Sequence, residues 1–219
     1  MKIALVEYGA GNLPSVERAL ARLGAEAFRA PGPDALAGAD TIILPGVGHF
    51  GALMRELGAR GMIDPLRERI TRGVPFLGIC LGLQALFSAS DEAPDDRGLN
   101  IYSGRVSALP PTAKLPHMGW NQLERPVPSR LLEGVAADAY FYFANSFAAL
   151  PGATGVANAE AALCDHGGRF VAVVENGNIC GTQFHPEKSG QAGARLLENF
   201  LRLAQSCVAQ PRRGEGAAR

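Results

Sequence analysis

The sequence lacks an excess of charge of either sign, and it lacks any long apolar run. Its 219 residues include 21 lysines and arginines against 21 aspartates and glutamates, so the formal net charge is zero. Proteins that bind nucleic acid or membrane surfaces normally carry a basic excess. No stretch approaches the roughly 18 consecutive apolar residues that a membrane-spanning helix requires. We therefore expect no nucleic-acid partner and no membrane partner.

Cysteine and histidine are scarce, with four residues of each. The cysteines are widely spaced and form no Cys-x-x-Cys pair, which argues against a metal cluster and a disulfide framework. The apolar segment that follows Lys2 stops at Glu7 and is too short for the core of a secretory signal. These absences predict reduced thiols, no metal, no cofactor and a cytoplasmic location.

Short apolar runs alternate with amphipathic segments in the first half of the chain. Apolar runs predict four strands, at residues 2–6, 26–28, 41–44 and 74–79. Helical periodicity or apolar character predicts four helices, at residues 13–23, 50–57, 64–71 and 81–87. Alternation of this kind predicts an α/β fold with a mostly parallel central sheet and helices on both faces.

The second half is richer in strands. We expect strands at residues 140–143, 170–175 and 178–184, and a final helix at residues 191–204. The Asn176-Gly177 pair between two of these strands is a strong hairpin signal. No linker or repeat interrupts the pattern, so we expect one domain over residues 1–205 and a disordered tail over residues 206–219.

The sharpest chemical signal is Cys80, in the segment Gly78-Ile79-Cys80-Leu81-Gly82 between a predicted strand and a predicted helix. A nucleophile on a tight strand-to-helix turn needs small neighbours, because the backbone there is strained and crowded. The turn also directs the next amide, that of Leu81, toward negative charge that develops on the substrate. The alternative is a buried core cysteine, which is what most free cysteines are.

A thiol nucleophile needs a base, and the base needs a group that orients it. His185 and Glu187 directly follow a predicted strand and are separated by Pro186. Because the two residues are two positions apart in extended backbone, their side chains can project to the same side. Glu187 can then bind one nitrogen of the His185 imidazole, while the other imidazole nitrogen faces Cys80. A lone histidine at a strand end is more often a surface residue, but its pairing with this cysteine and carboxylate favours function.

A glycine-rich loop lies between residues 46 and 51 and matches Gly-x-Gly-x-x-Gly read literally. In a dinucleotide-binding site, the glycine-rich turn follows the first strand and an acidic residue ends a strand about 20 positions later. This loop does not follow the first predicted strand, and no such acidic residue is present, so a dinucleotide site is disfavoured. Backbone amides near Val47 and Gly48 would instead supply the second wall of an oxyanion hole. A plain tight turn is the alternative.

These segments together resemble the class I (triad) glutamine amidotransferase family, and within it the glutaminase subunits of imidazole glycerol phosphate synthase. The general triad signature is carried by residues 73–84 (GVPFLGICLGLQ) and 181–187 (GTQFHPE). The subfamily is indicated by residues 8–13 (YGAGNL), 45–48 (PGVG), 116–121 (PHMGWN) and 188–190 (KSG). The resemblance extends from Met1 to about Leu203.

The resemblance implies a flavodoxin-like fold and a glutaminase mechanism. Cys80 would attack the side-chain amide of L-glutamine to form a thioester, and His185, oriented by Glu187, would carry the proton to the departing ammonia. Val47, Gly48 and the Leu81 amide would form the oxyanion hole. The substrate would be held by Gln84, Asn145 and Ser146.

The resemblance also implies a partner. Ammonia would pass to a (β/α)8-barrel cyclase subunit in a heterodimer that makes imidazole glycerol phosphate and AICAR ribonucleotide for histidine biosynthesis. Three residues would lie on or near the interface with that cyclase: Asn12, Trp120 and Lys188.

The chain departs from the family pattern at three positions. Glu7 stands where the family usually has aspartate, and Asn145 and Phe147 stand where it usually has histidine and tyrosine. None of these changes removes a reacting group. Two other hypotheses remain open: a glutaminase subunit of a different amidotransferase complex, and a non-enzymatic module that uses the fold only to bind a partner.

Overall fold

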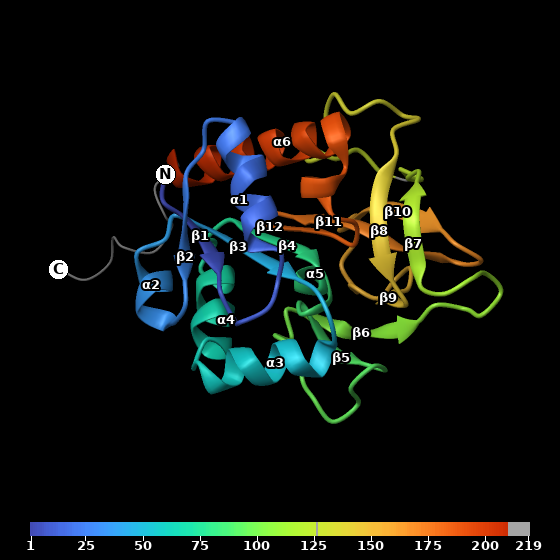
Figure 1. Ribbon diagram of the computed structural model, residues 1–219, viewed down its shortest axis with the longest axis horizontal. Helices are drawn as coiled ribbons and strands as arrows, with labels where there is room; N and C mark the ends of the chain where they lie inside the picture. The colour runs from blue at the N-terminus through green and yellow to red at the C-terminus, as the bar shows by residue number, and fades with distance from the viewer. Residues whose placement is uncertain (126, 210–219) are drawn as a thin grey trace.

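A seven-stranded sheet forms the centre of the protein in the computed structural model, which describes residues 1–125 and 127–209 (Figure 1). The strand order is β10-β11-β12-β4-β3-β1-β2. All neighbouring pairs from β12 to β2 are parallel, whereas β11 runs antiparallel to both β12 and β10. The predicted α/β fold with a mostly parallel central sheet is therefore confirmed.

The strands are β1 (Ile3–Val6), β2 (Ala27–Ala30), β3 (Thr41–Gly46), β4 (Phe76–Cys80), β5 (Phe87–Ser90), β6 (Tyr102–Ala108), β7 (His117–Asn121), β8 (Phe141–Asn145), β9 (Phe147–Ala149), β10 (Glu160–Asp165), β11 (Arg169–Asn176) and β12 (Ile179–Thr182). The helices are α1 (Leu13–Arg22), α2 (Pro33–Ala37), α3 (Phe50–Ala59), α4 (Ile63–Thr71), α5 (Leu81–Gln84) and α6 (Gly190–Ala209), with a 3-10 turn, η1 (Pro186–Lys188).

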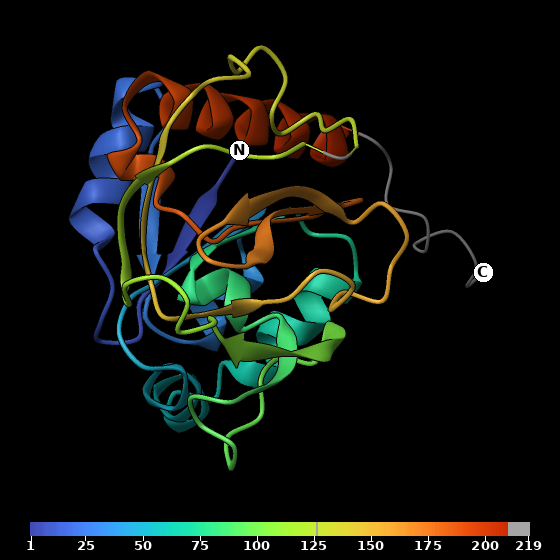
Figure 2. The same cartoon turned by 90° about the vertical axis from the view of Figure 1, so that its right-hand side faces the viewer.

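Two hydrophobic clusters cover the two faces of the central sheet. Alternate residues of β1 divide between them: Ile3 and Leu5 join one cluster, and Ala4 and Val6 join the other. The first cluster includes apolar residues of α1 and α6, and the second includes those of α2, α3 and α4. Figure 2 shows α1 and α6 along one face of the sheet and α3 and α4 on the other. The layers bury the sheet on both sides, as a parallel sheet requires.

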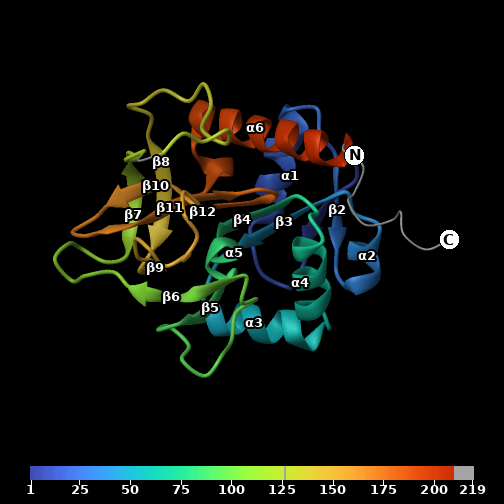
Figure 3. The same ribbon diagram turned by 180° about the vertical axis from the view of Figure 1, so that it is seen from behind.

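Two small sheets extend the molecule beyond the β10 end of the central sheet. One has the order β5-β6-β9, and the other pairs β7 with β8 in antiparallel register. Seen from behind, they lie at the end of the molecule opposite β2 and α2 (Figure 3). The register places His117 of β7 beside Asn145 of β8.

Two sequence-based boundaries are wrong. The helix expected at residues 81–87 ends at Gln84, because Phe87 begins β5 and pairs with Tyr102 of β6. The helix expected to end at residue 204 continues to Ala209, so the first four residues of the predicted tail are helical. The rest of that tail, residues 210–219, lies outside the described residues. Strands β5, β6, β7, β9 and β10 were not predicted.

The described part of the chain contains no helix that is both long and apolar enough to cross a membrane.

Candidate active site

The carboxyl ends of four neighbouring strands bring the candidate residues together. Tyr8 follows β1, Val47 follows β3, Cys80 ends β4 and His185 follows β12, and these strands are adjacent in the order β12-β4-β3-β1. Loops at the carboxyl edge of a parallel sheet are where such folds place ligands. Residues more than 100 positions apart in the chain therefore meet at one edge.

Cys80 lies on a strained turn between β4 and α5. Its φ of 54° and ψ of −108° place a non-glycine residue at positive φ, which costs on the order of 1–3 kcal/mol. Only glycine fits on either side: a Cβ on Gly82 would collide with the Leu44 carbonyl oxygen of β3, and one on Gly78 would lie 2.5 Å from the Gly82 carbonyl oxygen. The glycines of the segment thus allow α5 to start directly against the sheet.

His185 and Glu187 form a buried pair next to this thiol. The Nδ1 atom of His185 lies 2.9 Å from the Glu187 Oε1, and the two side chains are only 4% and 1% exposed. Burial lowers the pKa of His185, but hydrogen bonds to Cys80 and Glu187 outweigh burial and raise the pKa to about 10. With Nδ1 occupied by Glu187, the other ring nitrogen is the one that faces Cys80. The imidazole is therefore placed to hold a proton beside the sulfur.

A cavity of about 410 Å³ opens over Cys80 and His185. Most of the residues predicted from the sequence for catalysis and substrate binding line it: Val47, Gly48, Cys80, Leu81, Gln84, Asn145, Ser146 and His185. Lys188, predicted for the interface, lines it too. Glu187 lies behind His185 and does not line the cavity. Asn12 and Trp120 do not line it either; Trp120 is 55% exposed, and Asn12 precedes α1.

The amide predicted to serve the oxyanion hole is directed elsewhere. The Val47 N–H donates to the hydroxyl oxygen of Tyr8 at 3.2 Å. Tyr8 is buried, and its burial raises the pKa of the phenol to about 12, so the hydroxyl stays protonated. Val47 and Gly48 line the cavity, but in this arrangement the Val47 N–H is already engaged.

A chain of side-chain amides leads from the cavity wall to the thiol. The Gln84 Nε2 donates to the Phe147 carbonyl oxygen at 2.8 Å and to the Gln183 Oε1 at 3.0 Å. The Gln183 Nε2 in turn donates to the Cys80 Sγ at 3.6 Å. Asn145 donates from Nδ2 to the same Phe147 oxygen, while its buried Oδ1 has no hydrogen-bond partner among the described residues.

Three residues of this site were not assigned a role from the sequence. The sequence patterns include Tyr8 and Gln183 only as parts of larger segments, and they do not indicate Glu92, which lines the cavity. The Glu92 Oε2 accepts the Phe50 N–H at 2.7 Å, at the start of α3. No local pattern indicates the roles of these three residues, because each acquires its contact only when distant segments meet.

Packing accounts for His117, His166, Cys164 and Cys180. His117 stacks on His166 at 4.0 Å and on Phe143 at 4.8 Å, and burial lowers its pKa to about 4, so it is uncharged. Cys164 and Cys180 are buried, and burial raises the pKa of both thiols. Within the described residues no group of three or more histidine, cysteine or acidic side chains could hold a metal ion.

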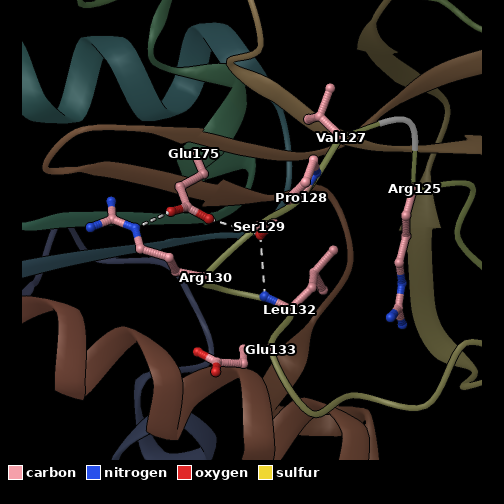
Figure 4. Close-up of a pocket in the computed structure, with 8 residues that line it drawn as sticks. All are labelled: Arg125, Val127, Pro128, Ser129, Arg130, Leu132, Glu133 and Glu175. Atoms are coloured by element: carbon pink, nitrogen blue, oxygen red, sulfur yellow. Dashed lines mark hydrogen bonds and ion pairs between the residues drawn. The ribbon is translucent and has the colours of Figure 1, made fainter.

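A larger cavity, of about 700 Å³, lies around Ser129 and Glu175 (Figure 4). Burial raises the pKa of Glu175, but hydrogen bonds from the Leu131 N–H, Arg130 and Ser129 outweigh it and lower the pKa. Those bonds measure 3.0, 2.7 and 2.8 Å. Glu175 pairs with Cys180 in the sheet, toward the amino end of β12 and away from His185. This carboxylate anchors the loop to β11 and is not free for chemistry.

Comparison with known proteins points to a single family. A sequence model described as "Glutamine amidotransferase class-I" matches residues 4–204. The protein "Imidazole glycerol phosphate synthase subunit HisH" of Methanothermobacter thermautotrophicus is 47% identical over 204 residues, which cover 93% of this chain and all of that protein. The protein of the same name from Desulfitobacterium hafniense is 46% identical over 202 residues, covering 90% of this chain and 92% of that protein.

Solved structures agree on the fold. A structure described as "Crystal structure of glutamine amidotransferase" superposes with a TM-score of 0.72 and 22% sequence identity. The match covers 92% of this chain and 98% of that chain.

Proposed function

The chain belongs to the class I glutamine amidotransferase family, and on that premise we propose that it is the glutaminase subunit of an imidazole glycerol phosphate synthase. Its substrate is L-glutamine, and its products are glutamate and ammonia. The observation that carries the proposal is the buried His185–Glu187 pair beside the strained Cys80, under a cavity that admits a small substrate. A biosynthetic enzyme of this kind works in the cytoplasm.

The first half of the reaction forms a thioester. His185 accepts the Cys80 proton, and the Sγ attacks the side-chain carbonyl carbon of glutamine. The carbonyl π electrons move to oxygen, where the Leu81 amide at the start of α5 stabilises the charge. When the intermediate collapses, the C–N bond breaks and His185 returns the proton to the leaving nitrogen, which departs as ammonia. Glu187 holds the imidazole in position throughout.

The second half hydrolyses the thioester. Water gives a proton to His185 and its oxygen adds to the thioester carbon. The C–S bond then breaks with its electron pair on sulfur, which releases glutamate and leaves the thiolate beside the protonated imidazole. The raised pKa of His185, about 10, suits a group that must keep this proton next to sulfur.

The unpaired Asn145 Oδ1 supports a role in substrate binding. It is an acceptor in a side chain that is only 7% exposed, and the residue lines the cavity together with Gln84 and Ser146. A buried acceptor without a partner is costly, so a donor such as the α-ammonium group of glutamine would satisfy it. Glu92 adds a carboxylate to the same wall.

We propose that a (β/α)8-barrel cyclase subunit docks over the mouth of this cavity. Met118 and Trp120 of β7 are 67% and 55% exposed, which is unusual for large apolar side chains. Trp120 packs edge-on against Tyr142, with ring centres 5.9 Å apart, and the Lys188 Nζ lies 5.6 Å from the centre of the Tyr142 ring. Since Met118 and Lys188 also line the cavity, a partner on this surface would receive ammonia without its release to solvent.

Replacement of the nucleophile tests the proposed reaction. Cys80→Ala should abolish glutamate release from glutamine in the presence of the cyclase, while its circular dichroism spectrum and its association with the cyclase stay unchanged. Retained glutamate release by this variant would refute the proposal. Copurification with a different synthase, and not with a barrel cyclase, would favour a glutaminase subunit of another amidotransferase complex.

A further inference from the structure

We propose that Gln183 is a further catalytic residue, whose side-chain amide stabilises negative charge on the Cys80 sulfur; this inference rests on the proposed glutaminase function. Gln183 lies between β12 and His185 and is completely buried. Its Nε2 donates to the Cys80 Sγ at 3.6 Å. The sulfur therefore faces two donors, the imidazole of His185 and the amide of Gln183.

The hydrogen-bond network fixes which end of the Gln183 amide faces sulfur. The Phe147 carbonyl oxygen can only accept, so the Gln84 atom 2.8 Å from it must be Nε2. The other proton of that NH2 group points to Gln183 at 3.0 Å, so the Gln183 atom that receives it must be Oε1. The remaining end of the Gln183 amide, an N–H donor, is then the one directed at Cys80.

A neutral thiol gains little from such a donor, whereas a thiolate gains much more. Sulfur in a thiol or a thioester is a weak acceptor, and hydrogen bonds to charged groups are stronger than bonds between neutral groups. The Gln183 N–H thus favours the state in which the proton has moved from Cys80 to His185. The Gln183 N–H stabilises the site most when negative charge resides on the Cys80 sulfur.

Charge appears on sulfur at two points of the reaction. Before the attack, the thiol proton has passed to His185 and the Sγ carries the electron pair that forms the S–C bond. During hydrolysis, the C–S bond breaks and its electron pair returns to sulfur, while His185 keeps the proton it took from water. In both steps an already oriented donor stabilises the sulfur anion without reorganisation.

The first test measures the reactivity of Cys80 directly. Iodoacetamide alkylation of Cys80, followed by peptide mass spectrometry across a pH series, reports the fraction of thiolate. Gln183→Leu should lower the alkylation rate near neutral pH about ten- to a hundredfold and move the rise in rate to higher pH. The groups that face this sulfur, His185 backed by Glu187, and Tyr8 after β1, are unchanged in the variant.

Two further variants keep the test decisive. Gln183→Glu preserves the shape of the side chain but replaces the donor with a carboxylate, and should lower the alkylation rate at least as far even if Gln183→Leu folds poorly. The matched control is Asn178→Leu, which removes an amide that bonds the Ile70 and Val74 carbonyl oxygens at the other end of β12. Asn178→Leu should alkylate like the wild type.

The second test examines turnover. With glutamine and the cyclase present, Gln183→Leu should release glutamate more slowly than the wild type, because both steps that place charge on sulfur lose a donor. If Cys80 is alkylated at the wild-type rate in both Gln183→Leu and Gln183→Glu over the whole pH series, the role of Gln183 is overturned. Alkylation needs neither glutamine nor a partner, so this outcome is independent of whether the wild type proves to be a glutaminase.

Discussion

At the scale of single residues, the site is organised by contacts that decide where each proton and amide lies. The contact between Tyr8 and the Val47 N–H directs an expected oxyanion donor away from the substrate cavity. The contact between His185 and Glu187 raises the pKa of the buried imidazole, so that it holds the proton that it takes from Cys80. Each contact leads to a prediction.

Replacement of Tyr8 by phenylalanine removes the acceptor of the Val47 N–H. The amide is then free to serve substrate, so glutamate release by the subunit alone should rise about fivefold, which corresponds to the loss of roughly 1 kcal/mol from one hydrogen bond. Stimulation by the cyclase should fall in proportion. Tyr140→Phe, which alters a 54% exposed tyrosine, is the control. An unchanged or reduced rate in Tyr8→Phe would show that the hydroxyl does not restrain this amide.

The raised pKa of His185 makes stability depend on pH with a defined sign. Since the folded-state pKa, about 10, exceeds the ordinary value of 6.5, protonation stabilises the native state. That contribution is complete below pH 6.5 and is lost as the pH rises toward 10. The free energy of unfolding of the wild type, relative to His185→Asn, should therefore decrease between these values in urea titrations. A difference that stays constant with pH would contradict the assigned charge.

At the scale of elements, the turn from β4 to α5 places the nucleophile, and glycine makes that turn possible. A Cβ at Gly82 would collide with the Leu44 carbonyl oxygen of β3. Gly82→Ala should therefore destabilise the protein by about 1–3 kcal/mol in urea unfolding and reduce Cys80 reactivity. Gly38→Ala is the control, since its φ is −88° and nothing lies within 4 Å of its Cβ position. Equal stability of the two variants would refute close packing at the turn.

The sequence predicted those elements whose pattern is local. Strands β1, β3 and β4 are apolar runs, and α1 presents Leu13, Val16 and Leu20 on one buried face, so period and composition suffice. The run from Leu81 to Phe87 is apolar apart from Gln84, and its pattern does not show where α5 ends and β5 begins. β6 pairs with β9, about 40 residues further on, through a register that no local pattern reveals.

The same distinction applies to the site. Cys80 among its glycines, and His185 with Glu187 two positions on, form compact patterns that the sequence displays. The contact between Gln183 and Cys80 spans 103 positions, and the contact between Tyr8 and Val47 spans 39. These contacts exist because β1, β3, β4 and β12 are neighbours in the sheet, which composition and spacing alone do not specify. Both contacts can be identified only once the fold is known.

At the scale of the whole molecule, the exposed aromatic surface beside the cavity belongs to the proposed partner interface. Trp120→Ala should weaken association with the cyclase about thirtyfold, the effect of a central aromatic contact worth roughly 2 kcal/mol. Phe28→Ala is the control, because Phe28 is 37% exposed on the edge strand β2 at the other end of the molecule. Isothermal titration calorimetry compares the two. Equal affinities for both variants would place the interface elsewhere.

In the proposed reaction, Cys80 releases ammonia from glutamine for use by a cyclase. The most direct test supplies the Cys80→Ala complex with either glutamine or an ammonium salt and measures imidazole glycerol phosphate. We predict product from the ammonium salt at the wild-type rate and none from glutamine. Product from glutamine at the wild-type rate in Cys80→Ala would contradict the account.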